Sequence, residues 1–305
     1  MKKSYFMIVA AAVCWGVIPI FYNGLSQSGL SSMQTITMRF SLAAVGYVIY
    51  LLLRDHSLLR IKRPVHLLYF VGTGICSVAF FNFCYITCIQ SAGVAVAALL
   101  LYTAPAFVLI MSAVLFGERL TVRGLIALGM TVTGCAFVAG AFAGGLTMSP
   151  AALLWGLGSG FGYALYSVFG KYALRHYRPE TITAYTAVFA ALATLPLAHP
   201  GELVGFLHSG TVWFHAIGCA LVCTVMAYLL YTGGLAKIPA GQASILSTIE
   251  PVVATVLGVA LLGESMSLHK LCGILLVLGA IVVLGAKPTS EGKTVREAID
   301  DRSTS

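Results

Sequence analysis

Long apolar stretches, separated by short charged or Gly- and Pro-rich segments, run through almost the whole chain. Each stretch is close to the length of about 20 residues that a helix needs to cross a lipid bilayer. If each apolar run forms one helix, the first set is 5–24, 32–53, 66–89, 94–116 and 121–140, and the second is 151–173, 180–198, 211–235, 240–262 and 268–286. The pattern predicts an all-α membrane protein with ten transmembrane helices.

The amino-acid composition supports a membrane protein. Of the 305 residues, 59% are hydrophobic and only 9% are charged. A soluble domain of this size needs more charge to keep its surface hydrated. The first apolar run follows Lys2 and Lys3 and lacks a clear small-residue cleavage site, so we interpret it as a retained helix and not as a removed signal peptide.

The positions of the basic residues predict the orientation. All Lys and Arg residues except Arg39 and Lys270 fall near the N-terminus, in alternate loops or after the last apolar run. Basic loops stay in the cytoplasm, so we expect a multi-pass protein of the cell membrane with both termini cytoplasmic. The net charge of +8 does not indicate nucleic-acid binding, because the basic residues are scattered over separate segments.

An internal repeat divides the chain. A shift of about 146 positions matches Tyr85 with Tyr231, Ala97 with Ala243, Pro105 with Pro251, and Gly117-Glu118 with Gly263-Glu264. Each copy holds five predicted helices, an odd number, so the second copy enters the membrane in the opposite sense. Inverted repeats of this kind are typical of secondary transporters, although a duplication kept only for packing is an alternative.

Several motifs in both copies resemble one known family. They are Trp15-Gly16, Arg39-Phe40, the segment from Pro105 to Gly117-Glu118, Glu250-Pro251 and Gly263-Glu264. In this order they resemble the drug/metabolite transporter superfamily, EamA type. The resemblance implies a 5+5 inverted repeat around a central cavity and transport by alternating access. It also implies amino acids, related metabolites or amphipathic drugs as substrates, usually exported across the plasma membrane.

The expected organisation has three parts: a first EamA-like repeat at 1–146, a second inverted repeat at 147–286 and a disordered cytoplasmic tail at 287–305. The second repeat departs from the first, because no Arg matches Arg39 and the Trp155-Gly156 pair lies earlier in its helix. We therefore expect the central cavity to be asymmetric.

Glu250 and Arg39 are the only acidic and the only basic residue well inside predicted spans. A carboxylate in hydrocarbon must be paired, protonated or in contact with water, so Glu250 is a candidate cation ligand or proton carrier, or a fixed counter-charge. Arg39 could bind a substrate carboxylate, pair with Glu250 or extend toward the interface. A structural role is favoured for Arg39.

Further candidates are polar or aromatic side chains near the expected cavity, and two prolines that interrupt helices at matched positions. The substrate-binding candidates beside Arg39 and Glu250 are Trp15, Asn82, Tyr102, Tyr163, Tyr228 and Thr248, and the helix-kink candidates are Pro105 and Pro251. A static kink is the alternative for the prolines, and an interfacial aromatic belt is the alternative for the aromatic residues.

Small residues serve packing in this interpretation. Gly156, Gly158, Gly160 and Gly162 form two overlapping small-xxx-small spacings that suit close helix contacts. The eight cysteines lie inside apolar runs with no His or acidic residue placed to complete a metal site, so we interpret them as small hydrophobic side chains.

The leading functional prediction is a secondary transporter of a small metabolite. The alternatives are an intramembrane enzyme and a lipid-scrambling or sensory membrane protein. An enzyme is disfavoured because no H-E-x-x-H motif occurs and no Asp lies in a span, and the absence of a P-loop argues against direct use of ATP. The expected partners are a small-molecule substrate and the lipid bilayer, without cofactor, metal or nucleic acid. Proton coupling and oligomeric state stay open.

Overall fold

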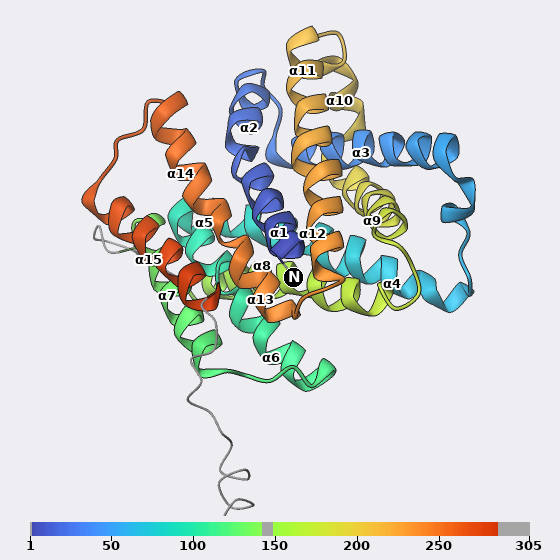
Figure 1. Cartoon of the computed structure of the whole chain (residues 1–305). Coiled ribbons are helices and arrows are strands. Elements are labelled where there is room, and N and C mark those ends of the chain that lie inside the picture. The colour runs from blue at the N-terminus through green and yellow to red at the C-terminus, as the bar shows by residue number, and fades with distance from the viewer. Residues whose placement is uncertain (1, 142–148, 286–305) are drawn as a thin grey trace, which may run out of the picture.

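The computed structural model describes residues 2–141 and 149–285, which are almost entirely helical and contain no strand. The helices before the gap are α1 Lys2–Gly16, α2 Ile18–Gln27, α3 Ser32–Arg54, α4 Leu67–Val71, α5 Phe80–Leu101, α6 Ala104–Phe116 and α7 Val122–Val138 (Figure 1). Those after it are α8 Pro150–Ala173, α9 Pro179–Thr194, α10 Pro200–Phe206, α11 Gly210–Gly218, α12 Ala227–Leu235, α13 Ala240–Ser247, α14 Ile249–Leu261 and α15 Leu268–Gly285. The expected boundary between the repeats at 146/147 and the tail at 287–305 lie outside the described residues.

Side-chain caps explain where several helices begin. Ser31 forms a capping box with Gln34 at the start of α3, and the Thr121 hydroxyl accepts a hydrogen bond from the Gly124 N–H at the start of α7. Ser149 caps α8 in the same way. These hydroxyls satisfy N–H groups that a helix leaves without partners at its first turn.

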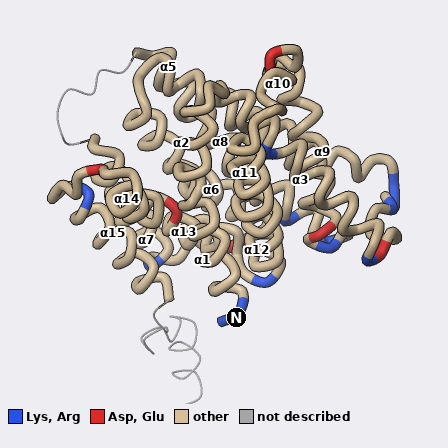
Figure 2. Tube along the Cα trace, turned by 90° about the horizontal axis from the view of Figure 1, so that it is seen from above, with Lys and Arg blue, Asp and Glu red and all other residues tan. Residues whose placement is uncertain are grey.

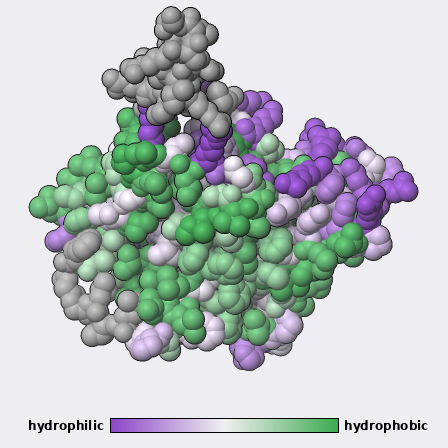
Figure 3. Space-filling model, turned by 90° about the horizontal axis from the view of Figure 1, so that it is seen from below, coloured by the Kyte–Doolittle hydropathy of each residue, from purple (hydrophilic) through white to green (hydrophobic). Residues whose placement is uncertain are grey.

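Eight helical segments in the described part of the chain are long and apolar enough to cross a membrane, and α6 and α7 are shorter apolar helices. The protein is therefore a multi-pass membrane protein. Its exterior fits this setting, since Leu53, Val114, Leu268 and Val282 are large apolar side chains with most of their surface exposed. Figure 3 shows apolar side chains over most of one face, with the strongly hydrophilic ones gathered toward its edges.

Two predicted helices are interrupted just before the matched prolines Pro105 and Pro251, although their apolar pattern is continuous. The expected helix 94–116 breaks at Tyr102-Thr103, between α5 and α6, and the expected helix 240–262 breaks at Thr248, between α13 and α14. The expected boundary between the helices 66–89 and 94–116 is present at Gly93, where a non-helical backbone with φ 84° and ψ 168° divides α5 into two helical segments. Only glycine adopts this backbone conformation readily.

The repeat is visible in the backbone as well as in the sequence. A π-helix, η3 (Gly72–Ala79), lies in the first copy, and a second one, η5 (Cys219–Met226), lies at the corresponding place in the second copy. π-Helices are rare and often mark functional sites. Their recurrence at matched positions indicates that the two copies share a fold and not only a hydrophobic pattern.

The two copies pack into each other. α1 of the first copy contacts α12, α13 and α14, while α8 of the second copy contacts α5 and α6, and α7 packs along α15. Small residues permit these approaches, as expected for the glycines of α8. A Cβ at Gly156 would lie 2.2 Å from the Leu100 side chain, and one at Gly160 would lie 2.8 Å from the Leu100 carbonyl oxygen.

Charged side chains lie mainly at helix ends and in loops. Figure 2 shows Lys and Arg in blue and Asp and Glu in red along the chain, with long uncharged stretches of helix between them. Arg39 and Glu250 depart from this distribution, because both belong to helices that line the interior.

Candidate functional site

A cavity of about 630 Å³ lies between the two copies. Its walls combine residues of α1, α2, α3 and α5 from the first copy with residues of α8, α12 and α14 from the second. The predicted site residues Trp15, Arg39, Asn82, Tyr102, Tyr163, Tyr228, Glu250 and Pro251 all line it. A volume of this size is typical of small-molecule sites in proteins.

Two of the predicted residues lie beside the main cavity. Thr248 and Pro105 line a small adjoining void, which they share with Tyr102, Tyr163 and Glu250. The Thr248 hydroxyl donates a hydrogen bond of 2.5 Å to the Ile245 carbonyl oxygen, where the helix is interrupted between α13 and α14. This hydroxyl is therefore not free to donate to a ligand.

The two prolines lie at helix starts. Pro105 is in the first turn of α6, directly after the break that follows α5, and Pro251 is in the first turn of α14, after the break that follows α13. Proline suits a first turn, where its missing N–H leaves no helical hydrogen bond unmade. The interruptions at matched positions are thus breaks between helices, and both breaks lie at the cavity.

Glu250 places an acidic group in this interior. Its Oε2 accepts a hydrogen bond of 3.3 Å from the Tyr163 hydroxyl. No described ion pair includes Glu250. The carboxyl group therefore faces the cavity with one neutral donor and no cationic partner among the described residues, which leaves capacity for a cation, an amine or a proton.

Arg39 places a basic group elsewhere in the same cavity wall. Only 4% of its surface is exposed, and its Nε has no hydrogen-bond partner among the described residues. The guanidinium carbon lies 4.6 Å from the centre of the Phe40 ring and 5.8 Å from that of Tyr22, within cation–π range. The ion pair with Glu250 that the sequence allowed is not among the described salt bridges.

Aromatic rings form one wall of the cavity. The Trp15 indole packs against Tyr163, Tyr228 and Tyr231, with ring centres 6.3, 5.4 and 5.3 Å apart. The pairs with Tyr163 and Tyr228 are edge-to-face and the pair with Tyr231 is tilted, and such ring contacts hold the rings in defined positions. The aromatic wall is thus a rigid apolar surface contributed by both copies.

Several cavity residues were missed in the sequence-based prediction, although helical spacing could have found them. Ile18, Pro19 and Tyr22 follow Trp15 at intervals of three, four and seven residues, and Ile86 and Ile89 follow Asn82 at intervals of four and seven. Residues with this spacing share one face of a helix. Extending each single candidate along its helical face predicts the α2 lining and part of the α5 lining.

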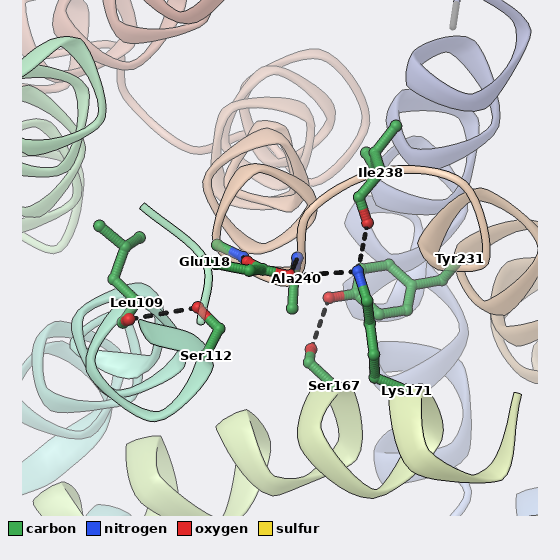
Figure 4. A network of polar contacts seen from close by, with 9 residues as sticks. Leu109, Ser112, Glu118, Ser167, Lys171, Tyr231, Ile238 and Ala240 are labelled. Carbon is green, nitrogen blue, oxygen red and sulfur yellow. Dashed lines mark hydrogen bonds and ion pairs between the residues drawn. The ribbon is translucent and has the colours of Figure 1, made fainter. Parts of the chain in front are cut away.

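Polar contacts close one end of the cavity: two lie within the second copy, between α8 and α12, and one joins the two copies. Beyond the aromatic wall, the Tyr166 hydroxyl lies 2.6 Å from the Thr232 hydroxyl, and the Ser167 hydroxyl lies 2.7 Å from the Tyr231 hydroxyl. One turn further along α8, Lys171 Nζ lies 3.1 Å from Glu118 Oε1, as Figure 4 shows. The cavity lining instead extends in the other direction to Glu264 and Lys270.

Comparison with known proteins identifies relatives. The family model described as "EamA-like transporter family" matches residues 2–140 and again 150–286. An "Uncharacterized transporter" of Archaeoglobus fulgidus is 33% identical over 289 residues, covering 93% of this chain and 96% of that protein. A "Probable amino-acid metabolite efflux pump" of Salmonella typhimurium is 22% identical over 296 residues, covering 92% and 94%.

One further relative matches only part of the chain, and one solved structure shares the fold of almost the whole chain. The "Threonine/homoserine exporter RhtA" of Escherichia coli is 30% identical over 132 residues, which is 41% of each chain. A solved structure, described only as "Crystal structure of protein", superposes with a TM-score of 0.77 at 22% identity, covering 93% of this chain and 97% of the other. At 22% identity, this structural similarity is evidence for a shared fold and not for a shared substrate.

Proposed function

We propose that this chain, which belongs to the EamA-like transporter family, is a secondary transporter that exports a small metabolite carrying both an amine and a carboxylate. The observation that carries the proposal is the cavity between the two copies. Among its mostly aromatic and apolar walls it holds one acidic and one basic side chain that belong to no described ion pair, Glu250 and Arg39, while the paired Glu264 and Lys270 lie at one end. A zwitterion with an apolar body complements such walls.

The proposed architecture has ten spans in two inverted sets of five, with both termini in the cytoplasm. Eight long apolar segments support it, and residues 94–116, the end of α5 together with α6, supply a further span by analogy with 240–261. α7 is the matched counterpart of α15 and completes the first set. Within this scheme the first copy extends to about residue 146 and the second to 286.

Alternating access follows from the placement of the cavity. It lies between copies of opposite orientation, so tilting one copy against the other can expose it first on one side and then on the other. Export of an amino acid or related compound is the direction that the names of two relatives support. Glu250 is the proposed group for proton coupling, because an isolated carboxyl group in a membrane interior can exchange a proton with water in the cavity.

The test is a thermal-shift screen of the purified protein against amino acids and related metabolites, followed by flux measurements in proteoliposomes. We expect ligands that stabilise the protein to be transported, and liposomes without protein to show no flux. Chemical conversion of a stabilising ligand without flux would favour an intramembrane enzyme instead. Movement of labelled lipid between leaflets without metabolite flux would favour a scramblase.

A further inference from the structure

The two Gly-Glu turns of the repeats have the same local geometry. Gly117 and Gly263 are both left-handed, with φ of 65° and 72°. The N–H of Glu118 donates to the Ser112 carbonyl at 3.3 Å, and the N–H of Glu264 donates to the Gly258 carbonyl at 3.1 Å. The backbone therefore presents the two glutamate side chains alike, and the difference between them arises from the residues that surround each turn.

Glu118 reaches across to the second copy. Its carboxylate accepts hydrogen bonds from the N–H groups of Ala240 at 2.9 Å and Gly241 at 3.3 Å, at the start of α13. Lys171 joins this contact, because its Nζ lies 3.1 Å from Glu118 and donates to the Ile238 carbonyl at 2.7 Å (Figure 4). A carboxylate at a helix N-terminus satisfies free N–H groups and meets the positive end of the helix dipole.

The repeat assigns a matching helix start to Glu264. The shift that relates Glu118 to Glu264 relates Ala240 and Gly241 to Val94 and Ala95. The backbone agrees, because the helix segment from residue 94 follows the non-helical Gly93 just as α13 follows Pro239. Val94 and Ala95 therefore stand where the first N–H groups of that segment are expected.

In this structure Glu264 does not make the matching contact. Its carboxylate pairs with Lys270 at 2.9 Å, and its side chain is 51% exposed. Glu264, Lys270, Val94 and Ala95 all line the cavity. The cavity thus lies between Glu264 and the helix start at Val94. At the opposite end, the contact between Glu118 and α13 closes the space between the copies.

We propose that Glu118 and Glu264 act as latches that hold the two ends of the cavity closed in turn. The end between Glu118 and α13 is the Glu118 mouth, and the end between Glu264 and the helix segment from Val94 is the Glu264 mouth. In the conformation described here, Glu118 caps α13 and holds one mouth closed. In the opposite conformation, Glu264 leaves Lys270 and caps the helix segment that begins at Val94, while Glu118 and Lys171 separate from α13. The inference rests on the proposed alternating access and names the contacts that exchange during it.

The latches are unequal. Lys171, from α8, strengthens the Glu118 contact, whereas Lys270, from the same copy as Glu264, holds that side chain away from its matched helix. Both lysines therefore favour the conformation with the Glu118 mouth closed. Removing Lys270 should release Glu264 to cap the segment at Val94, and removing the charge of Glu264 should have the opposite effect.

The test measures the two mouths directly by double electron–electron resonance, with the native cysteines replaced. One spin-label pair, Leu120→Cys with Lys237→Cys, spans the Glu118 mouth, and the other, Ser91→Cys with Met266→Cys, spans the Glu264 mouth. Glu118→Gln should increase the population with a wide Glu118 mouth and a narrow Glu264 mouth by about tenfold. Lys270→Gln should shift the populations in the same direction, and Glu264→Gln should shift them in the reverse direction.

Glu180→Gln is the matched control, because Glu180 forms an ion pair with Arg178 away from both latches and its loss should leave both distances unchanged. Unchanged distances in Glu118→Gln, or shifts of Glu264→Gln and Lys270→Gln in the same direction, would overturn the proposal. If Glu118→Gln does not fold, the other two variants decide. Wild-type flux in liposomes is measured separately, so correct distance shifts without flux would reject the proposed function and retain the latch.

Discussion

The hydroxyl of Tyr163 donates a hydrogen bond of 3.3 Å to Oε2 of Glu250, joining α8 to the first turn of α14 inside the second copy. Trp15 packs on the same tyrosine from the first copy. The acidic group is therefore positioned by one neutral hydrogen bond and by a ring that belongs to the other half of the molecule. Movement between the copies would change its surroundings directly.

We predict that Glu250→Gln abolishes flux driven by a pH gradient and leaves substrate exchange at equal pH partly intact. The amide keeps the size and the hydrogen-bond acceptor of the carboxyl group but cannot carry a proton. Proteoliposome flux with and without an imposed pH gradient measures both effects. Full pH-driven flux in this variant would rule out Glu250 as the proton carrier.

Tyr163→Phe tests whether the hydrogen bond positions Glu250. Removing one hydrogen bond to a charged group weakens an interaction by about 1.5–3 kcal/mol, so we expect flux to fall by about tenfold or more. Tyr185→Phe is a suitable control, because the Tyr185 hydroxyl bonds the Leu59 carbonyl far from the cavity. Equal losses in both variants would indicate a general folding defect.

Arg39→Gln should leave the protein folded but weaken the binding of carboxylate-bearing ligands by about tenfold or more. The reason is that Arg39 belongs to no described ion pair and its Nε has no hydrogen-bond partner among the described residues, so its charge contributes mainly the cation–π contacts with Phe40 and Tyr22 to the ligand-free protein. Thermal unfolding in detergent reports stability, and ligand-induced shifts in Tm report binding. A large fall in Tm, restored by a second substitution at Glu250, would instead indicate a structural ion pair.

Gly273→Ala should destabilise the protein by about 1–3 kcal/mol through overpacking. A Cβ at Gly273 would lie 2.6 Å from the Gly134 carbonyl oxygen, where α7 and α15 touch. Gly129→Ala is the matched control on α7, because nothing lies within 4 Å of a Cβ at that position. Unfolding in detergent compares the two variants, and equal stability would contradict close backbone contact between α7 and α15.

The orientation is tested with a reporter enzyme that is active only outside the cytoplasm. A fusion after Arg175, in the basic turn between α8 and α9, should be silent, and a fusion after Ser209, before α11, should be active. The expectation follows from the placement of Lys and Arg on one side of the predicted spans. The reverse pattern of activity would invert the topology.

The sequence by itself determined the features that depend on local hydrophobicity and on the repeat. The apolar runs predicted the helical membrane protein, the matched Pro and Gly-Glu positions predicted two related copies, and the motifs identified the EamA-type family, which the family match confirmed. Isolated charges in long apolar runs singled out Arg39 and Glu250, and both line the cavity. Such features can be predicted from the sequence because each span must by itself be apolar enough to be stable in the bilayer.

Only the tertiary structure decided which residues meet. The capping of α13 by Glu118, the separation of Glu264 from Val94 and the absence of a described ion pair between Arg39 and Glu250 depend on how helices from distant parts of the chain are tilted and rotated. Hydropathy carries no information on these angles, which side-chain packing at small residues sets. The matched prolines predicted interruptions near Thr103 and Thr248, whereas the π-helices were missed, because neighbouring helices supply the contacts that compensate for such an irregular backbone.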